Sequence, residues 1–131
     1  MKRIAVLLAM TASLLMAELN WADSYDAALA KAQKEGKMVM VMLSMEGCPA
    51  CEYMQDVVFN DDKVVEELQM GFVPVYFDIH KESVPKGLGY IGTPTFHFLK
   101  ADGTKAGRLD GGANVADFTE QMRTIKELYR N

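Results

Sequence analysis

The chain contains two cysteines, Cys48 and Cys51, and both stand in the pentapeptide GCPAC at positions 47–51. Thiols at this spacing suit a structural disulfide, part of a metal site, or a dithiol that exchanges disulfides with a partner. A disulfide across so short a loop constrains the unfolded chain by only about 2 kcal/mol. A chain of 131 residues, half of them hydrophobic, can bury a full core without that help. The structural disulfide is therefore a weak explanation of the pair.

A metal site also fits the sequence poorly. Structural zinc sites use four ligands, whereas there is no second cysteine pair and His80 and His97 have no recognisable spacing from the cysteines. Methionines alternate through positions 38–42 and Met45 follows, a pattern of thioethers that suits Cu(I). Methionine also fills irregular gaps in cores, and the residues between these methionines are equally apolar. The residues favour dithiol exchange with no metal or other cofactor, and copper or peptide binding is the alternative.

The periodicity of apolar residues predicts the elements around the pair. A helix capped by Ser24 and ended by Gly36 precedes the apolar run KMVMVMLS at 37–44, which is too short for a typical helix and predicts a strand buried on both faces. Pro49 suits the first turn of a helix beginning there, with Cys51, Met54 and Val58 at helical spacing. The cysteines should therefore lie at a strand-to-helix junction.

The remaining pattern completes one domain. Further along the chain we expect a short helix at 62–68, a strand at 72–78, a hairpin formed by 95–99 and 105–109, and a last helix capped by Asn114. This order predicts an α/β fold with a central mixed β-sheet flanked by helices on both faces.

The predicted junction gives the two thiols different roles. Unpaired N–H groups and the helix dipole favour negative charge at a helix N-terminus, so the thiolate of Cys48 should be stabilised there. Cys51 should lie one turn further in and be more shielded from solvent. A reactive outer thiol beside a protected inner one is the asymmetry that disulfide exchange requires.

Residues 1–17 have the composition of a secretory signal peptide. Lys2 and Arg3 precede an uncharged apolar segment that ends at Ala17, and this segment is too short to cross a bilayer comfortably. We therefore expect a signal peptide at 1–17, a single domain at 18–131, export to a bacterial periplasm and no stable membrane insertion after cleavage. Loss of two basic residues makes the net charge of −4 more negative still, and an acidic domain is a poor nucleic-acid binder.

These motifs together resemble the thioredoxin superfamily. The resemblance rests on the strand KMVMVML, the Cys-Pro-Ala-Cys pair and the later segment GTPTF, and it extends from about Trp21 to Leu128. The segments YDAALAKAQKEGKMVMV and VFNDDKVVEEL are most similar to the exported thioredoxin-like group, which includes the C-terminal domain of periplasmic thiol:disulfide interchange proteins. The resemblance implies a thioredoxin-like fold and thiol:disulfide oxidoreductase activity, with reduction or exchange favoured over installation of disulfides.

The resemblance also implies roles for individual residues. Cys48 would be the nucleophile and Cys51 the resolving thiol. Pro94 would be the family's cis-proline beside the cysteines, and Thr93 would offer backbone hydrogen bonds to a bound peptide. Gly111 or Gly112 matches the family's glycine near the site. The implied partners are exported proteins that carry disulfides and an upstream thiol that supplies electrons.

The active-site loop, Glu46, Gly47, Pro49 and Ala50, departs from the usual family pattern. Gly47 occupies the place of the family's tryptophan, and Met42 occupies that of its buried acid. Proton transfer to and from Cys51 should therefore use water or Glu46, although a nearby carboxylate also disfavours a thiolate. The Pro-Ala pair between the cysteines leaves the direction of electron flow open.

Overall fold

A computed structural model describes residues 18–129, and the expected signal peptide at 1–17 lies outside the described residues. The helices and strands follow one another in the order α1 (Tyr25–Glu35), β1 (Met38–Ser44), α2 (Pro49–Asp56), the 3₁₀ helix η1 (Val58–Asn60), α3 (Asp62–Gly71), β2 (Phe72–Asp78), β3 (Thr95–Leu99), β4 (Lys105–Asp110) and α4 (Val115–Leu128). Among residues 18–129, no helix has the length and apolar character needed to cross a bilayer.

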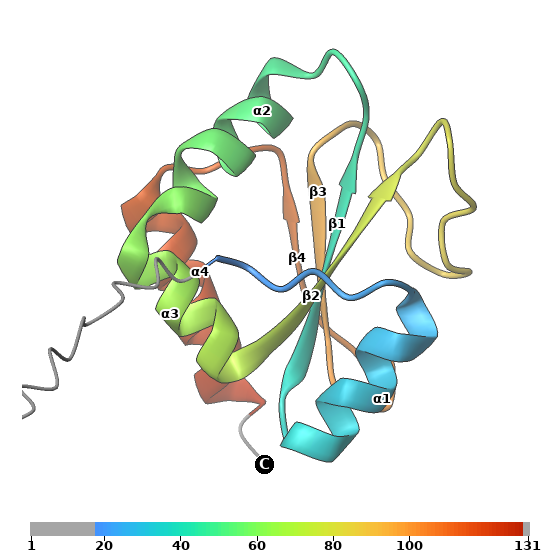
Figure 1. Cartoon of the computed structure of the whole chain (residues 1–131), viewed down its shortest axis with the longest axis vertical. Coiled ribbons are helices and arrows are strands. Elements are labelled where there is room, and N and C mark those ends of the chain that lie inside the picture. The colour runs from blue at the N-terminus through green and yellow to red at the C-terminus, as the bar shows by residue number, and fades with distance from the viewer. Residues whose placement is uncertain (1–17, 130–131) are drawn as a thin grey trace, which may run out of the picture.

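The four strands form one mixed sheet in the order β2-β1-β3-β4 (Figure 1). β1 pairs with β2 in parallel, while β3 is antiparallel to both β1 and β4. The mixed sheet that the sequence predicts is therefore confirmed. The strand that leads to Cys48 is an inner strand, so hydrogen bonds on both sides fix the position at which α2 begins.

Side chains of β1 alternate between two cores, one on each face of the sheet. Val39, Val41 and Leu43 pack with α1 on one face. Met40 and Met42 pack on the other face with α2, α3 and α4. Figure 1 shows α1 on the opposite side of the sheet from these three helices. Because both faces are covered, every residue of β1 is buried, as the unbroken apolar run indicates.

The helix ends are fixed by the residues that the sequence marks as caps. The Ser24 side chain accepts a hydrogen bond from the Ala27 N–H at 3.1 Å, and Gly36 ends α1 with a left-handed φ of 66°. The Asn114 side chain accepts from the Asp117 N–H at 2.8 Å. These caps satisfy backbone groups that a helix end otherwise leaves unpaired.

The segment after the cysteines differs from the sequence-based expectation. Val58 was expected on the same helix as Cys51, but α2 ends at Asp56 and Val58 begins a 3₁₀ turn. The Asn60 side-chain amide donates to the Asp56 carbonyl oxygen at 2.7 Å and so satisfies one end of α2. This turn buries Phe59 in the core on the α2 side of the sheet.

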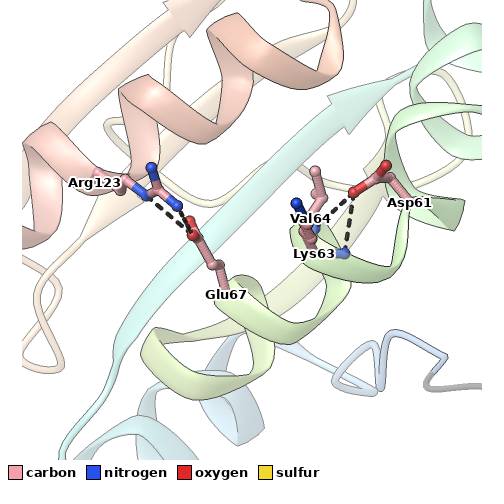
Figure 2. Close-up of polar contacts among 5 residues, drawn as sticks. All are labelled: Asp61, Lys63, Val64, Glu67 and Arg123. Atoms are coloured by element: carbon pink, nitrogen blue, oxygen red, sulfur yellow. Dashed lines mark hydrogen bonds and ion pairs between the residues drawn. The ribbon is translucent and has the colours of Figure 1, made fainter.

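The helix α3 has its own cap and an ion pair with α4. The Asp61 carboxylate accepts from the backbone N–H groups of Lys63 and Val64 at 3.0 and 3.1 Å, as Figure 2 shows. Glu67 forms an ion pair with Arg123 of α4. An exposed ion pair of this kind contributes at most about 1 kcal/mol, so the buried apolar faces hold these two helices to the sheet.

Candidate active site

The two cysteines lie where β1 passes into α2. Cys48 is the N-cap of α2 with extended backbone angles, and Pro49 follows in the first helical turn. The structure holds the pair as a disulfide, with the two Cα atoms 5.2 Å apart. The Cys51 N–H donates a hydrogen bond to Cys48 Sγ at 3.1 Å. A free helix N–H group is therefore directed at the first sulfur, where it would stabilise negative charge on the reduced thiol.

The difference between the two sulfurs does not come from exposure. We expected Cys51 to be more shielded than Cys48, and the two are almost equally buried, with Cys48 4 % and Cys51 3 % exposed in the disulfide form. The Thr93 carbonyl oxygen, 3.5 Å from Cys48 Sγ, helps to cover the first sulfur. What separates the two residues is the hydrogen bond, because Cys48 Sγ receives the helix N–H while Cys51 supplies it.

A segment distant in sequence covers Cys48. The Thr93 carbonyl oxygen lies 3.5 Å from Cys48 Sγ, across 45 residues of sequence. The Thr93–Pro94 peptide bond is cis, and the Thr95 hydroxyl donates to the Gly92 carbonyl oxygen at 2.7 Å. The structure therefore brings Thr93 and Pro94 next to the cysteine pair, where the sequence-based interpretation places them.

The loop between β4 and α4 forms a third side of the site. Gly111 has a φ of 87°, which favours glycine, and its N–H donates to the Pro94 carbonyl oxygen at 2.8 Å. A Cβ atom on Gly112 would lie 3.7 Å from the Ala50 Cβ and from the Met54 Sδ.

The thioether of Met54 helps to hold this loop. The Ala113 N–H donates a hydrogen bond to Met54 Sδ at 3.4 Å. The sequence indicates that Met54 belongs to the buried side of α2, but nothing in it marks Ala113 as a neighbour. That contact depends on the hairpin returning the chain to α2.

The other residues of the active-site loop are exposed. Gly47, Pro49 and Ala50 face solvent, and Gly47 has a φ of 75°. Glu46 forms an ion pair with Lys81 at 3.1 Å, and both side chains are well exposed. The hydrogen bond that the Lys81 ammonium donates to the Glu46 carboxylate raises the pKa of Lys81. The contact that the structure gives the Glu46 carboxylate is thus with a lysine, on the solvent side of the loop, and not with Cys51.

The methionines of β1 belong to the core. Met40 and Met42 are fully buried, and both lie in the cluster that also contains the two cysteines and Met54. Met42, at the position of the family's buried acid, therefore places a thioether beneath the dithiol. Within residues 18–129 there is no group of three or more His, Cys, Asp or Glu side chains that could hold a metal ion. The burial of these methionines supports core packing over a copper site.

His97 is buried in β3, on the central part of the sheet. Its Nε2 donates to the Gly89 carbonyl oxygen at 2.7 Å, which ties the loop before Thr93 to the sheet. Burial lowers the pKa of His97 below its ordinary value, as do the positive charges of Arg108 and Lys105, while the Gly89 hydrogen bond acts in the opposite direction. The lowered pKa favours the neutral form of His97, and its hydrogen bond to Gly89 acts as a structural tether. His80, in contrast, is exposed after β2.

Replacing His97 with glutamine should remove a pH dependence of stability. Because folding lowers the pKa of His97, the unfolded chain binds this proton more readily, and the free energy of unfolding should decrease as pH falls below about 6.5. One proton gives a slope of at most about 1.4 kcal/mol per pH unit. Chemical denaturation between about pH 8 and pH 5 measures this slope. His80→Gln is the matched control and should keep the dependence; an unchanged slope in His97→Gln would contradict the assignment.

The hydrogen bond to Cys48 Sγ predicts a difference in reactivity. In the reduced protein at about pH 6.5, iodoacetamide should alkylate Cys48 at least about tenfold faster than Cys51, because the thiolate is the nucleophile. Mass mapping of adducts over time measures both rates. In the unfolded protein the two thiols should react alike, which is the control. Equal or reversed rates in the folded protein would show that the N-cap position does not activate Cys48.

Comparison with known proteins finds a thioredoxin-like domain and similarity to thiol:disulfide interchange proteins. A family model described as a thioredoxin-like domain matches residues 25–126. The thiol:disulfide interchange protein DsbD of Yersinia enterocolitica is 30% identical over 103 residues, which cover 73% of this chain and 18% of that protein. DsbD of Vibrio cholerae is 33% identical over 81 residues, 58% of this chain and 13% of that protein. The chain thus spans less than a fifth of these relatives.

Solved structures agree with the family assignment. A thioredoxin from Thermus thermophilus is 34% identical, has a TM-score of 0.68, and the match covers 82% of this chain and 87% of that one. The oxidised C-terminal domain of DsbD from Neisseria meningitidis has a TM-score of 0.62 at 20% identity, over 79% of this chain and 97% of that domain. The second likeness shows the fold, and it extends over nearly all of that domain.

Proposed function

The chain belongs to the thioredoxin-like domain family, and from this premise we propose that it is an exported thiol:disulfide oxidoreductase. It reduces or exchanges disulfides in protein substrates through Cys48 and Cys51. The observation that carries the proposal is the hydrogen bond from the Cys51 N–H to Cys48 Sγ at a helix N-cap. This arrangement favours the thiolate on Cys48, and the thiolate is the form that attacks a disulfide.

The chemistry needs both sulfurs in sequence. The Cys48 thiolate attacks one sulfur of a substrate disulfide, the other substrate sulfur leaves as a thiolate, and a mixed disulfide forms. The Cys51 thiol loses its proton and attacks Cys48 Sγ, which releases the second substrate sulfur and closes the Cys48–Cys51 disulfide. The second step is fast because it is intramolecular and the two residues are already adjacent. Two electrons thus pass from the dithiol to the substrate, and an upstream thiol donor must return them.

The groups around the cysteine pair concern two further needs of the reaction, contact with a bound polypeptide and a proton acceptor for Cys51. The Cys48 Sγ and the Thr93 carbonyl lie together at the end of β1 and the start of β3. Thr93 would contact a bound polypeptide through its backbone. Gly112, which has no side chain, lies against Ala50 and Met54 of α2. Because Glu46 pairs with Lys81, we assign water as the proton acceptor for Cys51 in this proposal.

Export to the periplasm is part of the proposal. The composition of residues 1–17 and the similarity to DsbD support it. In that compartment the substrates would be exported proteins that carry disulfides, because disulfides form and persist in oxidising environments. The relatives are named thiol:disulfide interchange proteins, and this name supports exchange of disulfides.

The reduction potential of the Cys48–Cys51 pair tests the direction of electron flow. Equilibration in glutathione buffers, followed by acid quenching and mass analysis, gives the potential directly. A value near about −270 mV, the value of thioredoxin, would support a reductant, and a value near about −120 mV an oxidant. We expect the lower range, together with reduction of insulin disulfides by the reduced protein. A dithiol that does not equilibrate with glutathione would contradict the proposed function.

A further inference from the structure

Ile91 is an exposed apolar side chain in the loop that leads to Thr93 and so to the cysteine pair. It is 91 % exposed, more than any other large hydrophobic residue of the described chain, and its neighbour Tyr90 is also exposed. Ile91 lies two residues before Thr93 in the chain. The Thr93 carbonyl oxygen lies 3.5 Å from Cys48 Sγ. Two residues of chain span at most about 7 Å. The Ile91 backbone therefore lies within about 7 Å of Thr93, close enough for its side chain to meet a polypeptide bound at Cys48.

The segment that carries Ile91 is fixed on both sides. Before it, Leu88 is buried and the Gly89 carbonyl oxygen accepts a hydrogen bond from His97 Nε2 at 2.7 Å. After it, the Gly92 carbonyl oxygen accepts from the Thr95 hydroxyl at 2.7 Å. Because these contacts hold the backbone, Ile91 cannot reach the core by a local shift. A single exposed apolar residue is ordinary on a protein surface. Ile91, however, is held in a fixed loop two residues before Thr93, so it is placed to meet a partner bound at Cys48.

The surroundings of Cys48 favour an apolar partner. The exposed residues next to the sulfur on α2 are Pro49 and Ala50, and Gly112 lies directly beside Ala50. The nearest charge in sequence, Glu46, is paired with Lys81. Small and apolar groups therefore frame the sulfur, and burial of the Ile91 side chain against a partner would remove its apolar surface from water.

We propose that Ile91 is a specificity-determining residue that selects polypeptide substrates with an apolar side chain beside the reacting cysteine. The inference rests on the proposed function, because it concerns the partner that forms the mixed disulfide with Cys48. It adds the class of substrate: a cysteine next to a leucine, valine or similar residue reacts faster than one next to a polar residue. The contact forms before Cys48 attacks the substrate disulfide, so it changes the rate at which the mixed disulfide forms.

Two short peptides provide the test. Each carries one cysteine as a mixed disulfide with 5-thio-2-nitrobenzoate, and they differ in the preceding residue, which is leucine in one and serine in the other. The protein is used as the reduced Cys51→Ser variant, so that the reaction stops after Cys48 attacks the peptide sulfur and releases the coloured thiolate. The absorbance of that thiolate gives the rate constant, and mass analysis confirms the Cys48–peptide disulfide.

The ratio of the two rate constants is the readout. We expect the leucine peptide to react about tenfold faster, a factor that corresponds to about 1.4 kcal/mol. Adding Ile91→Ser should reduce the ratio to about one, whereas Ile91→Leu should preserve it. Leu128→Ser, which removes an exposed apolar side chain at the end of α4, is the matched control and should also preserve the ratio.

The outcomes separate this inference from the proposed function. Equal rates with both peptides before any change at Ile91, or a ratio that survives Ile91→Ser, would overturn the selective role while leaving the exchange activity in place. Failure of Cys48 to react with either peptide and with glutathione disulfide would overturn both. Sedimentation of the protein and of Ile91→Ser provides a further check, because a dimer that depends on Ile91 would assign this residue to a second copy of the chain and overturn the inference.

Discussion

Replacing Cys51 with serine should convert the protein into a trap that accumulates mixed disulfides with its substrates. Cys48 keeps its place at the N-cap of α2, so the first attack can still occur, but the thiol that releases the substrate is absent. The intramolecular step contributes an effective concentration of at least about 10⁵ M in well-oriented systems. Its loss should therefore lower turnover of insulin disulfides to background. Non-reducing electrophoresis after acid quenching measures the adducts in the cell.

Cys48→Ser is the matched variant and should form no adducts. The remaining thiol, Cys51, is buried. The hydrogen bond within the pair runs from the Cys51 N–H to Cys48 Sγ, so it does not stabilise a thiolate on Cys51. A purely structural disulfide predicts a different result, in which both variants lose similar stability and neither collects partners. Identical behaviour of the two variants would therefore contradict the oxidoreductase assignment, while adducts limited to Cys51→Ser would also identify the substrates.

Replacing Phe118 with alanine should destabilise the protein by about 3–5 kcal/mol. Phe118 lies on α4 and is fully buried. Its ring centroid is 5.4 Å from those of both Phe59 and Phe96 and 6.4 Å from that of Phe98, in mostly edge-to-face arrangements. These rings come from η1 and β3, so the truncation leaves a cavity at the point where α4 meets the sheet. A loss of this size is a large fraction of the about 5–15 kcal/mol of a typical domain.

Urea denaturation followed by circular dichroism measures this loss. The midpoint should decrease while the slope stays unchanged, since the surface exposed on unfolding is nearly the same. Met70→Ala is the matched control, because Met70 is an exposed apolar residue on α3 and its loss should change stability by less than about 0.5 kcal/mol. A similar midpoint for both variants would show that the cluster around Phe118 does not hold α4 to the sheet.

The local elements could be predicted because their signals lie in adjacent residues. The apolar run at 38–44 forms β1 because a strand covered on both faces needs no polar side. The helix caps lie within four residues of their hydrogen-bond partners, with Ser24 and Asn114 at helix starts and Gly36 at a helix end. Such contacts depend little on the rest of the fold. The short break at Val58 was missed because helical spacing continues through it, and the burial of Phe59 favours the 3₁₀ turn there.

The sequence by itself determined the dithiol and its position at a strand-to-helix junction. Spacing and residue type are enough for these, because Cys48, Pro49 and Cys51 lie within one helical turn. The family's motif then pointed to Thr93 and Pro94.

Only the tertiary structure decided what surrounds the sulfurs. Thr93 reaches Cys48 across 45 residues, and Ala113 reaches Met54 across 59, through strand pairing that no local pattern specifies. The same packing buries both cysteines almost equally and leaves Ile91 in solvent, although isoleucine is usually a core residue. The physical reason is that burial and cross-chain contact depend on which segments the sheet brings together, whereas helix caps and strand runs depend on neighbours in the chain.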